Sequence, residues 1–383
     1  MNSKTFANVF RAFMVTIFLS LEAWQSEASE PGNTEAGKWE SKATSFGGDE
    51  QDNARKLNEL VADGWEDVGP FDNGMVAFER SQEVVYKLVR RIEWPGNHIF
   101  FTAFSPDGKL YLGGGDTGTL RIWEVATGNQ LLELPVVVGL FTPDGKHLLA
   151  HKFEKTFSLF DVPGGQEVRA WETSEPIRSM ALAPDGKRVV SGHVDNLLRL
   201  WDFQTGKEIR KLEGHVEPAT AVFSPDSKQV LSASTDKTVR LWEVETGRLV
   251  RTFEDFKDAT PIAGHDLIVQ AFFLPGGRQI AGYVWGTDKT LLVWDAADGK
   301  VVRKLDLGAD HHKDVAISPD GRWLLTGHED RTVRLRDFTT GKELQRLEVA
   351  DTNVPRALNF SRDGRFVVSG SFRSWVYLWQ LQD

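Results

Sequence analysis

The sequence predicts an all-β protein in which one small antiparallel sheet recurs seven times. The main observation is a turn of the type Ser-Pro-Asp-Gly-Lys, present in seven variants spaced 37 to 50 residues apart. These copies are marked by Asp107, Asp144, Asp185, Asp226, Gly276, Asp320 and Asp363. A period of about 40 residues is the length of one four-stranded blade in a closed ring. The expected fold is therefore a seven-bladed β-propeller of four-stranded antiparallel blades, preceded by a small α+β N-terminal domain.

Each repeat carries the signals of four strands. The turn lies between short apolar runs, and a signature such as Leu-Arg-Leu-Trp-Asp follows, as at residues 198–202. A Thr-Gly-Lys type of turn then leads into another alternating run, as at residues 205–212. Alternation with a period of two indicates strands, and Pro and Gly suit the tight turns between them. So small a sheet cannot bury both of its faces alone, so the repeats must stack on one another.

Closing the ring requires a strand from the N-terminal side. The seventh repeat ends at Leu381 without a fourth strand, whereas residues 86–94 match the fourth strands of other repeats but have no blade before them. We expect residues 85–93 to pair as the outer strand of the last blade, which would place Leu88 near Leu378. This pairing would seal a sheet edge that otherwise invites aggregation.

Residues from about 84 to 383 resemble the WD-repeat family, whose units pair a Gly-His near their start with a Trp-Asp that ends the third strand. The resemblance implies a hydrogen-bonded chain of His, Ser or Thr, Asp and Trp inside a blade. We expect this structural network at His215, Ser232, Ser234, Asp236 and Trp242 of blade four, at His265, Thr287, Asp288 and Trp294 of blade five, and at Asp195 and Trp201 of blade three.

The network should be incomplete in other blades. Blade two has Phe160 and blade six has Arg336 at the Trp position, blade seven has Arg373 at the Asp position, and blade three has no Gly-His at its start. A structural role for these His and Asp residues is favoured over a catalytic one, because a buried indole needs a hydrogen-bond partner.

The N-terminal segment predicts three further parts. Residues 1–28 read as an export signal, because Lys4 and Arg11 come before or at the start of the apolar stretch 12–21, and Ser26-Glu27-Ala28 is a suitable cleavage site. That stretch is far shorter than the roughly 20 residues a membrane-spanning helix needs. Residues 29–37 are expected to be a disordered linker. Residues 38–81 predict a small β-α-β-β domain that resembles a bacterial domain of unknown function. The protein is thus expected in the periplasm or outside the cell, and the alternative is a cytoplasmic chain with a disordered N-terminal tail.

Composition narrows the range of partners and chemistries. A formal net charge of -10 disfavours nucleic acid, because phosphate backbones attract clustered Lys and Arg. The chain has no cysteine, so disulfides and thiolate metal sites are excluded. We expect a protein or peptide partner, no nucleic acid, membrane contact only transiently through the export signal, and a monomer or one subunit of a complex.

No segment predicts catalysis, a cofactor or a metal site. The stretch 310–314, Asp-His-His-Lys-Asp, would need a loop to converge on a metal, and we expect one of its His residues to take the Gly-His position of blade six. The Gly-rich stretch 113–118 precedes no helix and is interpreted as a turn instead of a phosphate site.

The leading interpretation is therefore a non-catalytic protein-interaction scaffold. Its partners should bind the face formed by the loops before the first strand and after the second strand of each blade. The residues expected on that face are His98, Asp116, Lys155, Glu175, Glu217, Trp285, Glu329, Arg373 and Trp375. Two alternatives remain open, namely an enzyme of the hydrolase or lyase type and a small-ligand or carbohydrate binder, each acting at the mouth of the central channel.

Overall fold

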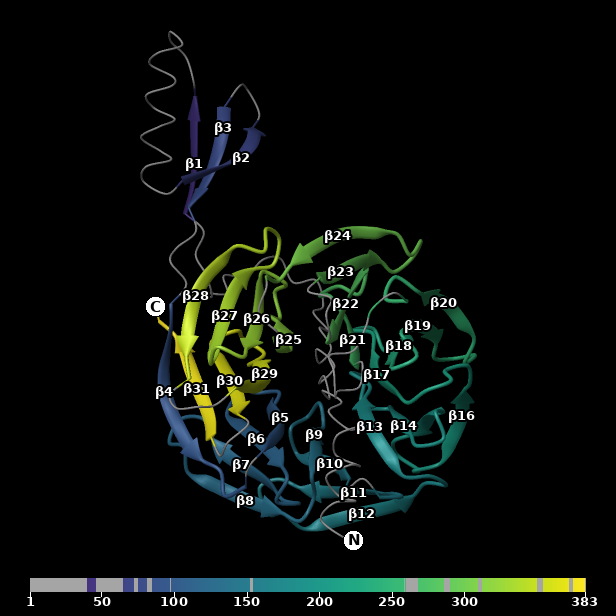
Figure 1. The fold of residues 1–383 in the computed structure, drawn as a ribbon. Helices are drawn as coiled ribbons and strands as arrows, with labels where there is room; N and C mark the ends of the chain where they lie inside the picture. Colours follow the sequence, from purple (N-terminus) through teal and green to yellow (C-terminus); the bar gives the residue numbers. More distant parts are fainter. Residues whose placement is uncertain are drawn as a thin grey trace.

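The computed structural model describes residues 40–45, 65–71, 75–80 and 85–382, the last range with gaps at 97, 152–153, 258, 260–267, 286–289, 309–311, 350–353 and 372–374. Seven four-stranded sheets stand side by side in a ring (Figure 1). Each is antiparallel, and the first strand of each blade lies towards the centre while the fourth lies at the outside. The predicted seven-bladed propeller is confirmed.

The strands of the first four blades have the following bounds. Blade one contains β5 (Ile99–Phe104), β6 (Leu110–Gly115), β7 (Leu120–Glu124) and β8 (Gln130–Leu134). Blade two contains β9 (Val138–Phe141), β10 (His147–His151), β11 (Thr156–Asp161) and β12 (Glu167–Glu172). Blade three contains β13 (Ile177–Leu182), β14 (Arg188–His193), β15 (Leu198–Asp202) and β16 (Glu208–Leu212). Blade four contains β17 (Ala219–Phe223), β18 (Gln229–Ser234), β19 (Val239–Glu243) and β20 (Leu249–Phe253).

The last three blades complete the ring. Blade five contains β21 (Ile268–Phe273), β22 (Gln279–Trp285), β23 (Thr290–Asp295) and β24 (Val301–Asp306). Blade six contains β25 (His312–Ile317), β26 (Trp323–His328), β27 (Thr332–Asp337) and β28 (Glu343–Glu348). Blade seven contains β29 (Pro355–Phe360), β30 (Phe366–Ser371), β31 (Trp375–Leu381) and, from the N-terminal side, β4 (Tyr86–Glu93).

β4 joins the two ends of the propeller. It pairs antiparallel with β31, and Leu378 lies opposite Arg90 while Trp379 lies opposite Leu88. The Gln345 side chain of blade six holds both backbone groups of Tyr86, accepting from its N–H at 2.7 Å and donating to its carbonyl at 2.8 Å. The closing strand is therefore fixed by its own blade and by the neighbouring one.

Burial follows from the position of each strand in its blade. The inner strand β5 is buried at all but one residue, because both of its faces meet neighbouring blades. The outer strand β16 is exposed or half-buried except at Leu212. In all seven blades the pairing of the third and fourth strands shifts by one residue, as between Leu200 and Trp201. Such a bulge twists an exposed edge and makes further strand pairing less favourable.

Long side chains of the outer strands reach the turn of the next blade. Arg210 donates to the carbonyls of Glu245 and Thr246, both at 2.5 Å. The next turn residue, Gly247, has a φ of 73°, and a Cβ there would lie 2.7 Å from Arg210 Cδ. Glycine is therefore required at position 247 for two reasons: the backbone is left-handed there, and the arginine side chain approaches too closely for a Cβ. Arg251 repeats the arrangement by donating to the Ala297 carbonyl at 2.7 Å.

The Gly-rich stretch near residue 113 differs from the expected turn. Gly113, Gly114 and Gly115 lie inside β6, and only the residues after them turn. A Cβ on Gly114 would lie 2.0 Å from the Val137 carbonyl oxygen, and one on Gly115 would lie 2.0 Å from that of His98. The glycines are needed because neighbouring backbone approaches the strand closely.

A separate three-stranded sheet precedes the propeller in sequence. It consists of β1 (Glu40–Ser45), β2 (Trp65–Phe71) and β3 (Met75–Arg80), with β3 in the middle and both pairs antiparallel. The helix expected between β1 and β2 lies outside the described residues, as do the predicted signal 1–28 and linker 29–37. Over the part of the chain that is described, no helix is long and apolar enough to cross a membrane.

Candidate functional site

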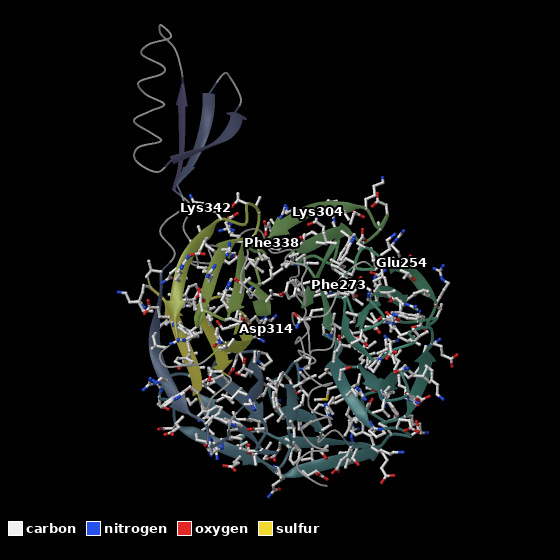
Figure 2. All side chains as sticks on the ribbon, in the orientation of Figure 1. Glu254, Phe273, Lys304, Asp314, Phe338 and Lys342 are labelled. Atoms are coloured by element: carbon white, nitrogen blue, oxygen red, sulfur yellow. The ribbon has the colours of Figure 1, made fainter. Side chains whose placement is uncertain are left out.

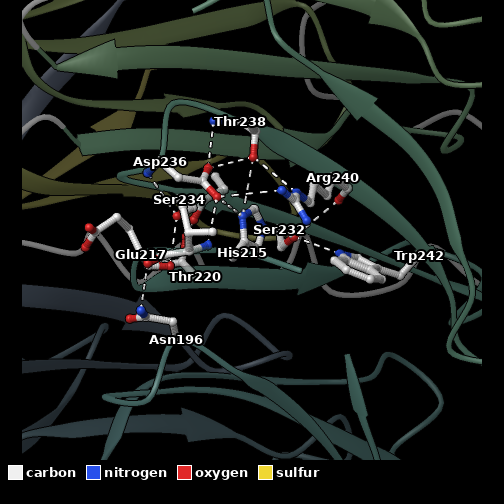
Figure 3. Close-up of polar contacts among 12 residues, drawn as sticks. Asn196, His215, Glu217, Thr220, Ser232, Ser234, Asp236, Thr238, Arg240 and Trp242 are labelled. Carbon is white, nitrogen blue, oxygen red and sulfur yellow. Dashed lines mark hydrogen bonds and ion pairs between the residues drawn. The ribbon is translucent and has the colours of Figure 1, made fainter. Parts of the chain in front are cut away.

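Blade four contains a chain of four hydrogen-bonded side chains (Figure 3). His215, from the loop before β17, places its Nδ1 2.8 Å from Asp236 Oδ2 and its Nε2 2.8 Å from Ser232 Oγ. The Trp242 indole donates to the same Ser232 Oγ at 2.8 Å. His215, Ser232 and Trp242 are buried. The chain thus ties the loop before the first strand to the second and third strands and to the turn between them.

The Asp236 carboxylate is the most heavily bonded group of this chain. Burial raises its pKa, but hydrogen bonds from His215 and Thr238 outweigh burial, so the pKa lies well below its usual range. Asp236 Oδ1 also accepts from the Thr238 backbone N–H at 2.9 Å. Ser234, also expected in the chain, lies beside it instead. Ser234 donates to the Glu217 carbonyl at 3.0 Å and accepts from the Asp236 N–H at 3.1 Å.

Blade three forms its network with a histidine that the sequence interpretation missed. The Trp201 indole donates to Ser191 Oγ at 2.7 Å, and Ser191 Oγ lies 2.7 Å from His193 Nε2. His193 comes from the end of β14 and not from the preceding loop, and its Nδ1 lies 2.9 Å from the Glu175 carbonyl oxygen. Asp195 is not part of this chain, because its carboxylate accepts from both terminal nitrogens of Arg199, at 3.0 and 2.6 Å.

Blade six uses the same arrangement. Thr326 Oγ1 lies 2.7 Å from His328 Nε2, so His328 supplies the histidine of this pair. Of the histidines expected in this blade, His311 and the side chain of His312 lie outside the described residues. The signal in the sequence was the pair Ser-Gly-His at 191–193 and Thr-Gly-His at 326–328. Arg336, at the Trp position, is buried and donates to the carbonyls of Gly341 at 3.1 Å and Leu307 at 3.4 Å. Burial lowers the pKa of the Arg336 guanidinium.

In the described part of blade five, a glycine and a phenylalanine pack against the tryptophan ring. Gly282 occupies the strand position that Ser232 holds in blade four, opposite the strand of the tryptophan. A Cβ on Gly282 would lie 2.6 Å from the Trp294 ring, and Phe256 packs edge-on against that ring at 5.6 Å. The Trp294 indole donates to Asp255 Oδ2 at 2.8 Å, a partner that the sequence interpretation did not identify. His265, Thr287 and Asp288 lie outside the described residues.

Blade one shows the same substitution. A Cβ on Gly113 would lie 3.4 Å from the Trp123 ring and 3.7 Å from that of Trp94, and the two indole rings pack at 6.0 Å. Blades three, four and six therefore have polar centres, whereas blades one and five have aromatic centres. All of these contacts serve packing inside a blade, and none leaves a reactive group open to solvent.

Of the residues expected on the loop face, two pairs lie in contact: His98 with Asp116, and Lys155 with Glu175. The Asp116 N–H donates to the His98 carbonyl at 3.1 Å. Lys155 Nζ lies 3.8 Å from Glu175 Oε2 and donates to the Ser174 carbonyl at 2.6 Å. Glu217 lies beside blade three at Asn196 (Figure 3), and Glu329 is exposed.

Of the two tryptophans expected on this face, the structure describes the side chain of Trp375 only. Trp375 is half-buried, packs against the core of blades six and seven, and carries the Arg91 guanidinium 4.1 Å from its ring centroid. It therefore packs inside the molecule and is not an exposed anchor. Of Trp285 only the backbone is described, and Arg373 lies outside the described residues.

The opposite face contains the seven turns of the Pro-Asp-Gly type, and most of them share one pattern of hydrogen bonds. In five of the seven turns of the Pro-Asp-Gly type, a Ser or Thr donates to the turn aspartate two residues later. These hydrogen bonds are Ser105 to Asp107, Thr142 to Asp144, Ser224 to Asp226, Ser318 to Asp320 and Ser361 to Asp363, at 2.5 to 2.7 Å. Hydrogen bonds within its own turn thus engage each of these carboxylates.

Within the described ranges, no group of three or more His, Asp or Glu side chains could hold a metal ion. Of the stretch 310–314, Asp314 is buried near the centre of the ring (Figure 2) and accepts from the Leu358 N–H of the next blade at 2.6 Å. This hydrogen bond joins blades six and seven.

Comparison with known proteins agrees with this architecture. The family model "WD domain, G-beta repeat" matches residues 87–124, 165–202, 206–243, 300–337 and 341–380, which together are half of the chain. Each match combines the outer strand of one blade with three strands of the next. The repeats with Phe160 and with the long loop before β21 are not among the matched segments.

Three relatives share parts of the chain. Nuclear distribution protein PAC1 of Coccidioides posadasii (strain C735) is 34% identical over 96 residues, which are 23% of this chain and 20% of that protein. Small ribosomal subunit protein RACK1y of Oryza sativa subsp. japonica is 30% identical over 132 residues, 33% of this chain and 38% of that protein. Cilia- and flagella-associated protein 52 of Chlamydomonas reinhardtii is 26% identical over 128 residues, 33% of this chain and 20% of that protein. The matches thus cover well under half of each relative. The seven four-stranded blades and the matched repeats lead to one conclusion: the chain belongs to the WD-repeat family.

Proposed function

We propose that this protein is a non-catalytic scaffold that binds other proteins on the face formed by the loops before the first strand and after the second strand of each blade. The observation that carries the proposal is the contrast between the two faces. On one face the turn carboxylates are engaged within their own turns, as at Asp107 and Asp226. On the other face the described loops carry different side chains, as varied as His98, Lys155 and Val216.

The described side chains support binding more than chemistry. The histidines of blades three, four and six are buried and hydrogen-bonded to a hydroxyl in the blade. A general base needs access to substrate, which these residues lack. A rigid ring with a variable loop face suits the recognition of a partner, because binding residues are commonly carried on loops that a rigid scaffold positions.

The scaffold proposal is tested with the full chain in two assays. Affinity capture from native extract, quantified against an unrelated propeller, should recover the same partner in repeated preparations. A panel of hydrolase and lyase substrates should show no turnover above the buffer rate. Turnover that tracks the purified protein, with no repeatable partner, would reject the scaffold in favour of an enzyme at the channel mouth.

Export is part of the same proposal and rests on residues 1–28 alone. If that segment is removed after Ala28, the mature protein begins at Ser29. N-terminal sequencing of the protein isolated from fractionated cells should find Ser29 in the periplasmic or extracellular fraction. A chain that keeps its first residues and stays with the cytoplasmic fraction would contradict export and leave the scaffold proposal standing.

A further inference from the structure

One exposed apolar side chain stands apart from the others. Val216 is 71% exposed and lies on the loop face, in the loop before β17. The other exposed large apolar side chains in the described part of the chain are 37% to 52% exposed and all lie on outer strands. They are Leu88, Val89, Leu131, Val168, Ile209, Leu249, Val250, Val302 and Leu344. Among the described residues of the loop face, Val216 is thus the one exposed large apolar side chain.

The backbone that carries Val216 is held from several sides. Its N–H donates to Asp236 Oδ2 at 3.3 Å, and its carbonyl accepts from the Asn196 amide at 2.8 Å. The preceding His215 is anchored inside blade four, and the Glu217 carbonyl accepts from Ser234 at 3.0 Å. The loop is therefore clamped between blades three and four (Figure 3). A partner that binds here need not order it, which removes one of the main costs of association.

Asn196 adds a second sign of a fixed local geometry. It has a φ of 65°, a left-handed conformation that asparagine adopts more readily than most residues other than glycine. Its side-chain amide is thereby directed to the Val216 carbonyl of the neighbouring blade. The contact holds the turn after β14 and the loop before β17 together as one surface.

The charges around Val216 are mainly carboxylates. Glu213 and Glu217 flank it in sequence and are exposed, and within the described residues neither makes an ion pair. The nearby carboxylate of Asp195 is neutralised by Arg199, with a closest distance of 2.6 Å. The half-buried Lys237 of the next turn donates to the Lys257 carbonyl at 3.3 Å, and Arg240 pairs with Asp236 at 3.8 Å. The surface thus combines a fixed apolar side chain with two unpaired negative charges.

We propose that residues 194–197 and 213–218 form a docking point for a segment of a partner protein that carries an apolar side chain beside Lys or Arg. The apolar side chain covers Val216, and the cation pairs with Glu217. This inference rests on the proposed scaffold function and names the partner chemistry for that face. The net charge of -10 favours the same partner, because complementary charge steers association.

The test uses the full chain and an immobilised peptide library as the probe. The library has three matched sets of short peptides in which an apolar residue is flanked by Lys and Arg, by Asp and Glu, or by Ser and Gln. The basic set should be enriched, and its binding should weaken as salt is raised. Affinities of the best binders are then measured in solution for the wild type and for the variants Val216→Asp and Glu217→Lys.

Matched control variants separate this site from general surface effects. Val302→Asp changes a valine that is 50% exposed on β24, and Glu348→Lys changes an exposed glutamate at the end of β28. Val216→Asp should weaken binding about tenfold or more, as expected for a central anchor, and Glu217→Lys should weaken it and reverse its preference towards the acidic set. The two controls should keep the wild-type affinity.

The possible results distinguish a failure of the docking point from a failure of the scaffold proposal. Equal enrichment of the acidic or neutral sets, or equal binding by wild type and Val216→Asp, would overturn the docking point. If Val216→Asp still recovers the partners found by affinity capture, the scaffold stands and its contact lies elsewhere. All four variants change exposed side chains, so unchanged melting temperatures verify that a loss of binding is not a loss of fold.

Discussion

At the scale of single residues, Ser232 connects the histidine and the tryptophan of the hydrogen-bonded chain in blade four. Its hydroxyl meets both His215 Nε2 and the Trp242 indole, and it is completely buried. Replacing it by alanine leaves two buried polar atoms without their partner, each of which costs about 1 to 3 kcal/mol. Ser232→Ala should therefore lower the free energy of unfolding by roughly 2 to 6 kcal/mol, measured by urea titration. Ser234→Ala is the control. It removes a hydroxyl beside the chain that donates to the Glu217 carbonyl and accepts from the Asp236 N–H, and it should cost about 1 kcal/mol because both partners lie in loops that water can reach.

The buried histidines of blades two and three predict how stability depends on pH. Burial lowers the pKa of His151 to about 3 and that of His193 to about 4. Both are neutral in the folded protein, whereas in the unfolded chain they bind a proton below about pH 6.5. The unfolded state thus binds more protons between pH 6.5 and 4, so stability falls as the pH is lowered through that window.

The prediction is a free energy of unfolding that decreases from pH 7 to pH 4.5, by at most about 1.4 kcal/mol per pH unit for each histidine. His193→Gln should flatten this slope, even though it lowers stability at pH 7. An identical slope in His193→Gln and the wild type would show that another group controls acid sensitivity.

At the scale of the elements, the outer strands connect one blade to the next through arginine. Arg210 donates to two carbonyls of the turn after β19, and its neighbour Lys211 is exposed and makes no such contact among the described residues. A guanidinium can serve two carbonyls at once through its fork of donors, which an apolar chain cannot replace.

Arg210→Met should lower the free energy of unfolding by about 1 to 2 kcal/mol, a value kept low because these contacts are solvent-exposed. The matched change Lys211→Met should alter it by less than about 0.5 kcal/mol. Equal effects of the two substitutions in urea titrations would mean that the arginine contact does not join the blades.

At the scale of the whole molecule, the periodic turns predicted the number of blades, because each turn must recur wherever an equivalent sheet begins. The centres of the blades were less predictable. His193 and His328 take their places from the second strand, and Phe256 and Trp94 from loops, so several different sequences produce an equivalent packed centre. Sequence spacing identifies the hydroxyl and the tryptophan on adjacent strands, but it does not show which distant side chain fills the space above them.

The loop face was predicted as a surface but not in its details. Trp375 looked like an anchor in sequence, and the structure places Arg91 over its ring because the closing strand β4 lies beside it. Val216 gave no signal in sequence, since its exposure depends on how the loop before β17 is held by Asn196 of the preceding blade. Such contacts join residues of different blades, and no local pattern encodes them.

The closing strand makes the strongest prediction for the whole molecule. A truncated chain that begins at residue 95 lacks β4 and would leave the edge of β31 open over residues 375–381. It also loses the Gln345 contacts to Tyr86 and the Arg90 contact to the Ala126 carbonyl at 3.2 Å. An open edge rich in Val, Leu, Tyr and Trp pairs readily with other chains, and a ring cut at one junction loses packing on both sides.

We therefore expect the truncated chain to melt at a lower temperature and to associate with increasing concentration, as measured by light scattering coupled to size-exclusion chromatography. The comparison is a chain that begins at residue 84, which lacks the N-terminal sheet but keeps β4. Because the two chains differ only in residues 84–94, a difference in melting temperature or mass reports the closing strand together with Trp94, and not the N-terminal domain. A monomer as heat-stable as the longer chain would mean that the ring holds together without its N-terminal strand.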